Sequence, residues 1–299
     1  MTSYSRPKAA GGSSAFRRIE PYLYMLPAIL FVAVFLLYPA AYTFYVSFTR
    51  WDGLNPPVFI GLQNYIQLTR ESVFGTSLLN TVIWVVATLI FPVLLGLALA
   101  VFVNRIPFQS FFKSIFYLPY AVSATSVAVI WTFMLSPFGV VNEALRAAGL
   151  DGVARNWLMM PPWNTLSMLM AYTWQTTGTN MILFLVGLQA IPTEPVEAAK
   201  LDGASSWQTF RRIILPLLRP ITVVVITIAV VNSFKVFDLI WVMTQGGPYR
   251  SSETLAVTRY RESFVLFRLG FGAAIANTLS LIVIMFSIVY LRSIFRRED

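Results

Sequence analysis

The chain has 299 residues, 57% apolar and only 12% charged, and a mean hydropathy of +0.68, a composition that excludes an ordinary soluble protein and predicts a membrane protein. The absence of Cys and His excludes disulfides, thiolate and imidazole catalysis and the common zinc sites, so no metal site is predicted. The formal charge of +9 comes from basic residues spread between apolar windows and does not indicate a nucleic-acid-binding surface.

The chain begins with a predicted tail followed by one membrane span. Residues 1–20 are small, polar and basic, and we expect them to form a cytosolic tail. The next window, residues 21–49, contains no charged residue. A cleavable signal peptide has an apolar stretch of only about 7–15 residues, so this longer window predicts a retained span.

Five further windows are long enough to cross a bilayer. Residues 72–104, 114–142, 156–193 and 269–291 have no charge, and residues 220–245 carry only Lys235 and Asp238. Since about 20 helical residues cross about 30 Å of hydrocarbon, each window holds one helix. Pro92 and Pro119 are expected to kink or end their helices. The predicted fold is an all-α membrane protein, residues 21–295, with six transmembrane helices at residues 22–48, 76–103, 114–136, 165–190, 220–243 and 271–292.

The distribution of Lys and Arg indicates the orientation. With the N-terminus inside, 13 basic residues lie in cytosolic segments and 8 in external ones, which favours both termini in the cytosol. The external segments would be residues 50–71, 137–163 and 246–268. Their Gly, Pro, Asn and aromatic residues predict turns and short amphipathic helices rather than a folded external domain.

One polar stretch, residues 193–219, separates the fourth and fifth predicted spans. Thr193 or Glu194 is a plausible N-cap before Pro195, and Gly203 interrupts the helix that follows. Ser205 and Gln208 have the spacing of a capping box, which predicts a second helix running to Pro216. The stretch therefore predicts a helix, a sharp turn and a helix, although many membrane proteins have short amphipathic helices at this interface.

The residue order of this stretch resembles a known motif. Glu197-Ala198-Ala199, then Gly203, then Ile213 and Leu215-Pro216 match the EAA loop of ATP-binding-cassette (ABC) importer permeases at every defining position. The resemblance covers about residues 20–295, including GLQNY (61–65), WQTTGTNM (174–181) and FKVFDLIWVMTQGGP (234–248). These segments look like the carbohydrate-type permeases related to the larger maltose-transporter subunit, without that subunit's extra external domain and N-terminal helices.

The resemblance implies the type I importer fold, also called MetI-like, and a set of partners. They are a second homologous permease subunit, two cytosolic ATPase subunits, an extracytoplasmic binding protein and a small sugar-class substrate, in the bacterial cytoplasmic membrane. The EAA helix of such proteins docks on the ATPase. The implied coupling residues are Glu197, Ala198, Ala199, Leu201, Asp202 and Gly203, of which Asp202 is equally well explained as solvated. The chain has no Gly-Lys dipeptide and hence no phosphate-binding loop, so ATP and Mg belong to the partner ATPases.

The fifth predicted span carries the candidate substrate path. If the helix is continuous, Lys235 and Asp238 share one face in the outer half of the membrane and can pair. An interfacial pair is the alternative. In the fourth span, Trp174, Gln175 and Asn180 either line the cavity or serve helix packing through hydrogen bonds. The full candidate set is Asn232, Phe234, Lys235, Phe237, Asp238, Trp241, Trp174, Gln175 and Asn180, with the aromatic residues of the fifth span stacking on a sugar ring.

Two classes of function remain after these observations. The first is the permease subunit of an ATP-driven, binding-protein-dependent importer that moves a sugar or sugar derivative by alternating access, with sulfonated, phosphorylated and glycerol-phosphate-like cargoes left open. The alternative is an ion-coupled secondary transporter or another polytopic membrane protein, including an enzyme. No inverted repeat of the motif and no catalytic constellation is detectable, so the EAA loop favours the permease and no enzyme is predicted.

Overall fold

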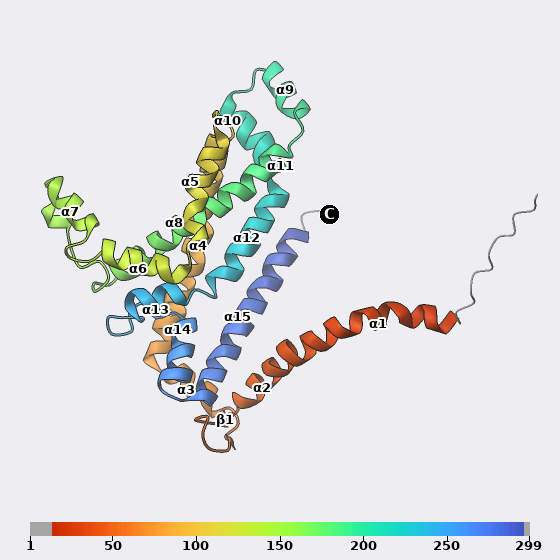
Figure 1. Ribbon diagram of the computed structural model, residues 1–299, viewed down its shortest axis with the longest axis vertical. Coiled ribbons are helices and arrows are strands. Elements are labelled where there is room, and N and C mark those ends of the chain that lie inside the picture. Colours follow the sequence, from red (N-terminus) through yellow and green to blue (C-terminus); the bar gives the residue numbers. More distant parts are fainter. Residues whose placement is uncertain (1–13, 296–299) are drawn as a thin grey trace, which may run out of the picture.

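Helices dominate the computed structural model, which describes residues 14–295 (Figure 1). The strands of this part are a short antiparallel pair, β1 (Thr49–Arg50) and β2 (Val58–Phe59). The α-helices are α1 (Ser14–Val32), α2 (Tyr38–Val46), α3 (Gln63–Arg70), α4 (Ser72–Val103), α5 (Gln109–Ala121), α6 (Ala124–Met134), α7 (Val140–Ala147), α8 (Trp163–Gln189), α9 (Glu194–Leu201), α10 (Ser206–Thr209), α11 (Leu215–Leu217), α12 (Arg219–Ser233), α13 (Asp238–Thr244), α14 (Leu255–Tyr260) and α15 (Leu269–Phe295). The predicted all-α class is confirmed.

Shorter helical turns connect some of these elements. π-Helical turns join α1 to α2 (Ala33–Leu37) and α10 to α11 (Phe210–Ile214), and a third follows α14 (Arg261–Val265). One 3-10 turn, Asp151–Val153, lies between α7 and α8. The predicted external segments therefore contain short helices and turns, as expected.

The first candidate span, Tyr24–Val46, comprises the end of α1 from Tyr24 onward, the π-helical turn Ala33–Leu37 and α2. In Figure 1 this helix extends away from the rest of the molecule, and none of its most apolar window is buried. Of the predicted cytosolic tail, residues 1–13 lie outside the described residues, and residues 14–20 already belong to α1. The first span thus presents an apolar surface to lipid or to another chain.

The centre of the helical body is the packing of α8 against α4, α5 and α12. Trp84 and Phe184 are among the largest fully buried side chains of this core. At Gly178 an added Cβ would lie 1.8 Å from the carbonyl oxygen of Phe116, so α5 and α8 approach too closely for any side chain there. Small residues commonly allow such contacts between membrane helices, where van der Waals packing drives association.

The predicted third span is broken into two helices. α5 ends at Ala121 and α6 begins at Ala124, and the two axes meet at 94°. Pro119 lies in the last turns of α5 and Val122 is extended, while the Ser123 side chain caps α6 by accepting a hydrogen bond from the backbone N–H of Ser126. The expectation of one helix over residues 114–136 is therefore wrong.

Three single helices of the described chain are long and apolar enough to cross a membrane: Tyr24–Val46, Ser72–Val103 and Leu269–Tyr290. Three bent pairs pass the same criteria when taken together: α5 with α6, α8 with α9, and Ser206–Leu217 with α12. Counting one span for each bent pair gives six, which agrees with the six-helix expectation. The exact span boundaries stay predictions.

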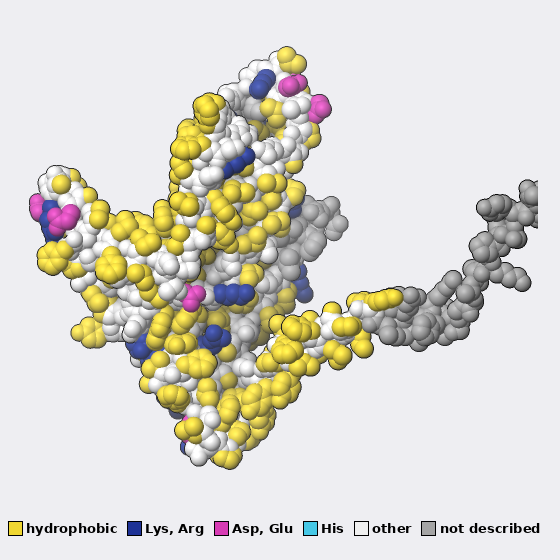
Figure 2. All heavy atoms as spheres, viewed as in Figure 1, with side chains coloured by type: hydrophobic (Ala, Val, Ile, Leu, Met, Phe, Trp, Pro, Cys, Tyr) yellow, Lys and Arg dark blue, Asp and Glu magenta, His cyan; other side chains and the backbone are white. Residues whose placement is uncertain are grey.

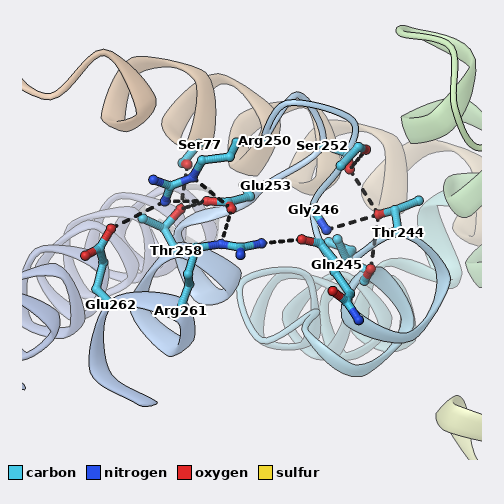
Figure 3. A network of polar contacts seen from close by, with 12 residues as sticks. Ser77, Thr244, Gln245, Gly246, Arg250, Ser252, Glu253, Thr258, Arg261 and Glu262 are labelled. Atoms are coloured by element: carbon cyan, nitrogen blue, oxygen red, sulfur yellow. Dashed lines mark hydrogen bonds and ion pairs between the residues drawn. The ribbon is translucent and has the colours of Figure 1, made fainter. Parts of the chain in front are cut away.

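A buried ionic network fixes the segment between α13 and α15 (Figure 3). Glu253 is fully buried, and it accepts hydrogen bonds from Arg250 Nε (2.9 Å), Arg250 Nη2 (2.8 Å), Arg261 Nε (2.6 Å) and Thr258 Oγ1 (3.0 Å). Glu262 is also buried and accepts a hydrogen bond from Arg268 Nε at 2.8 Å. Each buried carboxylate thus has guanidinium partners, which offset the cost of removing its charge from water.

The same segment is tied to the central helices. Asn80 on α4 donates to the carbonyl oxygens of Ser251 and Glu253, and Asn164 on α8 donates to that of Gly247. Burial opposes the charge of Arg250, but hydrogen bonding and charge from Glu253 outweigh it and raise the pKa of Arg250 above its ordinary value. We name residues 245–268 the tethered segment.

We expect Glu253→Gln to destabilise the protein by about 3 kcal/mol, because it leaves partly buried guanidinium groups without their carboxylate. The measurement is the thermal unfolding midpoint of the full chain in detergent. Glu143→Gln is the matched control, because Glu143 pairs with Arg146 at an exposed site where ion pairs contribute about 0–1 kcal/mol. Equal shifts of the midpoint in both variants would show that the network does not stabilise the fold.

Candidate functional site

The EAA loop, residues 193–219, lies at one end of the molecule, opposite the end formed by β1 and α3 (Figure 1). α9 begins after Thr193 with Pro195 in its first turn, as expected, although the Thr193 side chain makes no capping hydrogen bond. Gly203 has a φ of +77°, a conformation that glycine adopts without strain. The predicted capping box is confirmed. The backbone N–H of Gln208 donates to the Ser205 hydroxyl, and the backbone N–H of Ser205 donates to the Gln208 side-chain oxygen.

The predicted coupling residues lie together on α9 and the turn after it. Glu197, Ala198, Asp202 and Gly203 are exposed, and Leu201 is 89% exposed. Ala199 alone of the set is buried. Figure 2 shows acidic and basic side chains gathered at this tip of the molecule. An exposed leucine beside carboxylates, at the end of a projecting helix, is suited to contact with another protein.

The candidate substrate path coincides with a break in the fifth predicted span. α12 ends at Ser233, residues 234–237 are not helical, and α13 begins at Asp238. Lys235 and Asp238 therefore do not share a helix face, and no ion pair joins them among residues 14–295. The predicted pairing is wrong.

The break has a physical cause in the packing of its apolar residues. Phe234 is buried in a cluster with Val85 and Val230, whereas Val236 is buried in a different cluster with Trp84. The non-helical turn at residues 234–237 places each side chain in its own cluster and leaves Asn232, Lys235 and Asp238 exposed. The Ser233 hydroxyl donates to the carbonyl oxygen of Val230 at 2.7 Å and so satisfies one acceptor at the end of α12.

An aromatic set lies beside the exposed polar residues of the break. Phe237 stacks on Trp241 with ring centroids 5.8 Å apart, and Tyr260 of α14 contacts both rings at 4.6 and 4.8 Å. Phe264 continues the set at 5.3 Å from Tyr260. The guanidinium of Arg261 lies 5.4 Å from the centre of the Trp241 ring. Sequence reasoning missed Tyr260 and Phe264, although their four-residue spacing signals one helical face.

The candidate residues of α8 have separate environments. Gln175 is buried and donates from Nε2 to the carbonyl oxygen of Val122 at 3.1 Å, in the break between α5 and α6. Asn180 is buried where α8 meets Gly96 of α4. These contacts agree with the helix-packing alternative. Trp174 is instead 43% exposed and packs edge-on against Trp131 at 5.9 Å.

Trp174 also lines an apolar cavity. The cavity has a volume of about 640 Å³ and lies between α4, α5, α6 and α8. Its lining is almost entirely apolar and consists of Phe91, Leu95, Leu99, Ile115, Phe116, Pro119, Trp131, Leu166, Leu169, Met170, Thr173, Trp174, Thr177 and Gly178. The structure thus separates Trp174 from the aromatic set, which lies around α13 and α14. Within residues 14–295, no group of three or more His, Cys, Asp or Glu side chains is placed to hold a metal ion.

Comparison with known proteins connects these features. Residues 92–298 match the family of binding-protein-dependent transport system inner membrane components. A protein of Pyrococcus horikoshii named as a probable ABC transporter permease is 36% identical over 280 residues, which are 93% of this chain and 96% of that protein. The trehalose/maltose transport system permease protein of Thermococcus litoralis is 34% identical over 281 residues, which are 93% of this chain and 94% of that protein.

A solved structure shows the same fold. A chain of a bacterial ABC transporter involved in the import of the acidic polysaccharide alginate superposes with a TM-score of 0.83 at 24% identity, covering 94% of this chain and 97% of that one. The family description and the apolar helices place this chain in a membrane as a multi-pass protein, and the family is a transport component rather than an enzyme. The chain belongs to the binding-protein-dependent transport system inner membrane components, as a permease subunit of ABC importers.

Proposed function

We propose that the chain forms one half of an importer that moves a sugar or sugar derivative into the cell by alternating access, driven by separate ATPases. The observation that carries the proposal is the projecting EAA loop in a chain whose relatives transport trehalose/maltose, arabinooligosaccharides and lactose. The chain itself holds no cofactor in this proposal. ATP and Mg act in two cytosolic ATPase subunits, and a second homologous permease and an extracytoplasmic binding protein complete the assembly.

Coupling to ATP hydrolysis is proposed to occur at α9. The exposed Leu201 supplies an apolar contact, Ala198 allows close approach, and Glu197 offers a carboxylate for a basic group of the ATPase. Gly203 permits the turn that directs the chain back into α10. Because α9 is nearly free of packing against the rest of the chain, its position can follow that of a docked partner.

The substrate path is proposed to pass the break between α12 and α13. Asn232, Lys235 and Asp238 offer exposed donors and acceptors for hydroxyl groups, and Trp241 with Phe237 offers a face on which a sugar ring can stack. Tyr260 extends this face onto α14. Lys235 also suits an anionic sugar derivative, so sulfonated, phosphorylated and glycerol-phosphate-like cargoes belong to the proposal.

The rival function, an ion-coupled carrier, needs ionisable groups that change charge during transport. Lys235 and Asp238 are the charged residues of the fifth predicted span, and they do not form a pair in the described chain. The membership of the chain in a family of binding-protein-dependent systems favours the ATP-driven importer.

We expect Glu197→Ala and Gly203→Leu to lower substrate-stimulated ATPase activity of the assembled transporter at least about tenfold, because each removes part of the docking helix or its turn. The measurement is ATP hydrolysis and uptake in proteoliposomes, with co-purification of the ATPase as a readout of docking. Asp151→Ala, an exposed acid between α7 and α8, is the matched control and should behave like the parent. Normal stimulation and uptake in both loop variants would refute the coupling role.

We expect Trp241→Ala to raise the half-saturating substrate concentration about 2- to 10-fold, which corresponds to the loss of an aromatic contact of about 0.5–1.5 kcal/mol. Trp241→Phe keeps an aromatic ring and should retain most of the apparent affinity of the parent. The cargo is first identified by a thermal-shift screen on the binding protein, and transport is then measured with that compound. Lys235→Ala should alter the preference between neutral and anionic sugars. Unchanged uptake of every substrate in these variants would show that the break between α12 and α13 is not part of the substrate path.

The proposed orientation places both termini and the EAA loop in the cytosol. Because the chain has no cysteine, single replacements report sidedness without background. A membrane-impermeant maleimide should label Asn55→Cys in intact cells and Ser206→Cys only after the membrane is opened. The two positions lie at opposite ends of the molecule, and the reverse labelling pattern would invert the topology.

A further inference from the structure

A second groove lies where α4 meets the second arm of the EAA loop. Its volume is about 470 Å³, and its lining is Leu94, Leu97, Ala98, Val101, Arg105, Ser206, Trp207 and Phe210. None of these residues belongs to the predicted docking helix, to the aromatic set or to the cavity around Trp174. The transport proposal therefore leaves this groove without a role.

The α4 side of the groove is a single helical stripe. Leu97, Ala98 and Val101 lie three, four and seven residues after Leu94, the spacing of one helical face. Arg105, four residues after Val101, continues the series just beyond the helix end. From Leu94 to Arg105 the rise is about 16 Å, half of a hydrocarbon core of about 30 Å. The stripe therefore has the depth of one bilayer leaflet and ends in a cation.

The end of this stripe has the chemistry of a membrane interface. The Arg105 side chain is exposed and has no hydrogen bond or ion pair within residues 14–295. Across the groove, Trp207 is 65% exposed and stacks on Phe210 with centroids 5.8 Å apart. Phe108 and Phe111, in the connection after α4 and at the start of α5, are also exposed. Trp in particular is enriched where a membrane protein passes through the headgroup region.

We propose that this groove binds one anionic phospholipid. An acyl chain lies along the Leu94–Val101 stripe, the phosphate pairs with Arg105, and the Trp207 ring contacts the glycerol region. Arg211 and Arg212, exposed beside Phe210, add positive charge at the same level, so a negative headgroup is favoured over a neutral one. Since α10 forms the other wall, the bound lipid braces the second arm of the EAA loop against α4.

Lipid fits this groove better than a soluble partner does. The α4 wall belongs to the helix Ser72–Val103, which is long and apolar enough to cross a membrane. A water-soluble ATPase reaches the exposed α9, whereas the Leu94 end of the stripe lies about one leaflet deep. Lipid binding in this groove requires only that α4 crosses the bilayer, whatever the cargo of the transporter.

The test is native mass spectrometry of the full purified chain with phosphatidylglycerol or phosphatidylcholine carrying the same acyl chains. The parent should retain phosphatidylglycerol preferentially. Arg105→Ala should weaken this binding about fivefold, the effect of one basic residue near a membrane surface. Ala98→Phe should displace the lipid by filling the groove from an exposed position. Arg70→Ala, an exposed arginine of α3, is the matched control and should retain the lipid like the parent.

Equal retention of the two lipids, or retention by Arg105→Ala that matches the parent, would overturn the proposal. If Ala98→Phe does not elute as a folded protein, Arg105→Ala decides. A photoreactive benzoylphenylalanine in place of Ala98, in membranes of cells that also produce the partner chains, distinguishes the occupants. A cross-link to phospholipid supports the site, and a cross-link to a protein chain instead refutes it. These outcomes are independent of transport activity, so they do not depend on the proposed cargo.

Discussion

The structure depends on one constraint, that a backbone polar group at membrane depth must find its partner within the protein. Continuous helices such as α4 meet it by themselves, but this chain breaks two of its apolar windows. At the first break, the carbonyl of Val122 receives a hydrogen bond from Gln175. At the second, the hydroxyl of Ser233 satisfies an acceptor at the end of α12. Gln175 and Ser233 are thus polar residues of apolar windows that complete the backbone hydrogen bonding at the two breaks.

The tethered segment connects the aromatic set to the ionic network through a single side chain, Arg261. Arg261 donates to the buried carboxylate of Glu253, and the same guanidinium lies over Trp241. It also donates to the carbonyl oxygen of Gln245 at the end of α13. A change in the position of α13 therefore acts directly on a fully buried carboxylate. The aromatic set is held by a stiff frame, which is what a stacking surface needs in order to discriminate between ring geometries.

The parts of the fold that follow from local patterns could be predicted from the sequence. Long uncharged windows indicated the spans, Ser205 with Gln208 indicated the start of α10, and the EAA order indicated the family. The breaks and the ionic network could not be predicted in this way, because they depend on contacts between distant segments. Phe234 and Val236 are two residues apart but are buried in different clusters, and the hydrophobic pattern of the sequence does not indicate this separation.

The burial of two carboxylates could not be predicted from the local sequence either. Glu253 and Glu262 lie in a segment that opens with Gly-Gly-Pro and is rich in Arg and Ser, which has the composition of an exposed loop. Only the three-dimensional fold shows that arginines 250, 261 and 268 converge on them and that Asn80 and Asn164 hold the backbone in place. Similarly, the sequence predicts one continuous helix through Asn232, Lys235 and Asp238, whereas α12 ends at Ser233 and α13 begins at Asp238.

The arrangement of α9 to α12 connects the two proposed sites mechanically. α9 is exposed, and the chain from Ser206 to Leu217 meets α12 at a bend of 68°. α12 is a helix of 15 residues, about 22 Å long, and its far end is the break that exposes Lys235. A rigid helix transmits a displacement at one end to the other, whereas the non-helical residues 234–237 allow α12 to move without carrying α13 with it. Because α13 is fixed by the tethered segment, motion of the EAA loop would change the spacing between Lys235 and the aromatic set, which is the change that alternating access requires.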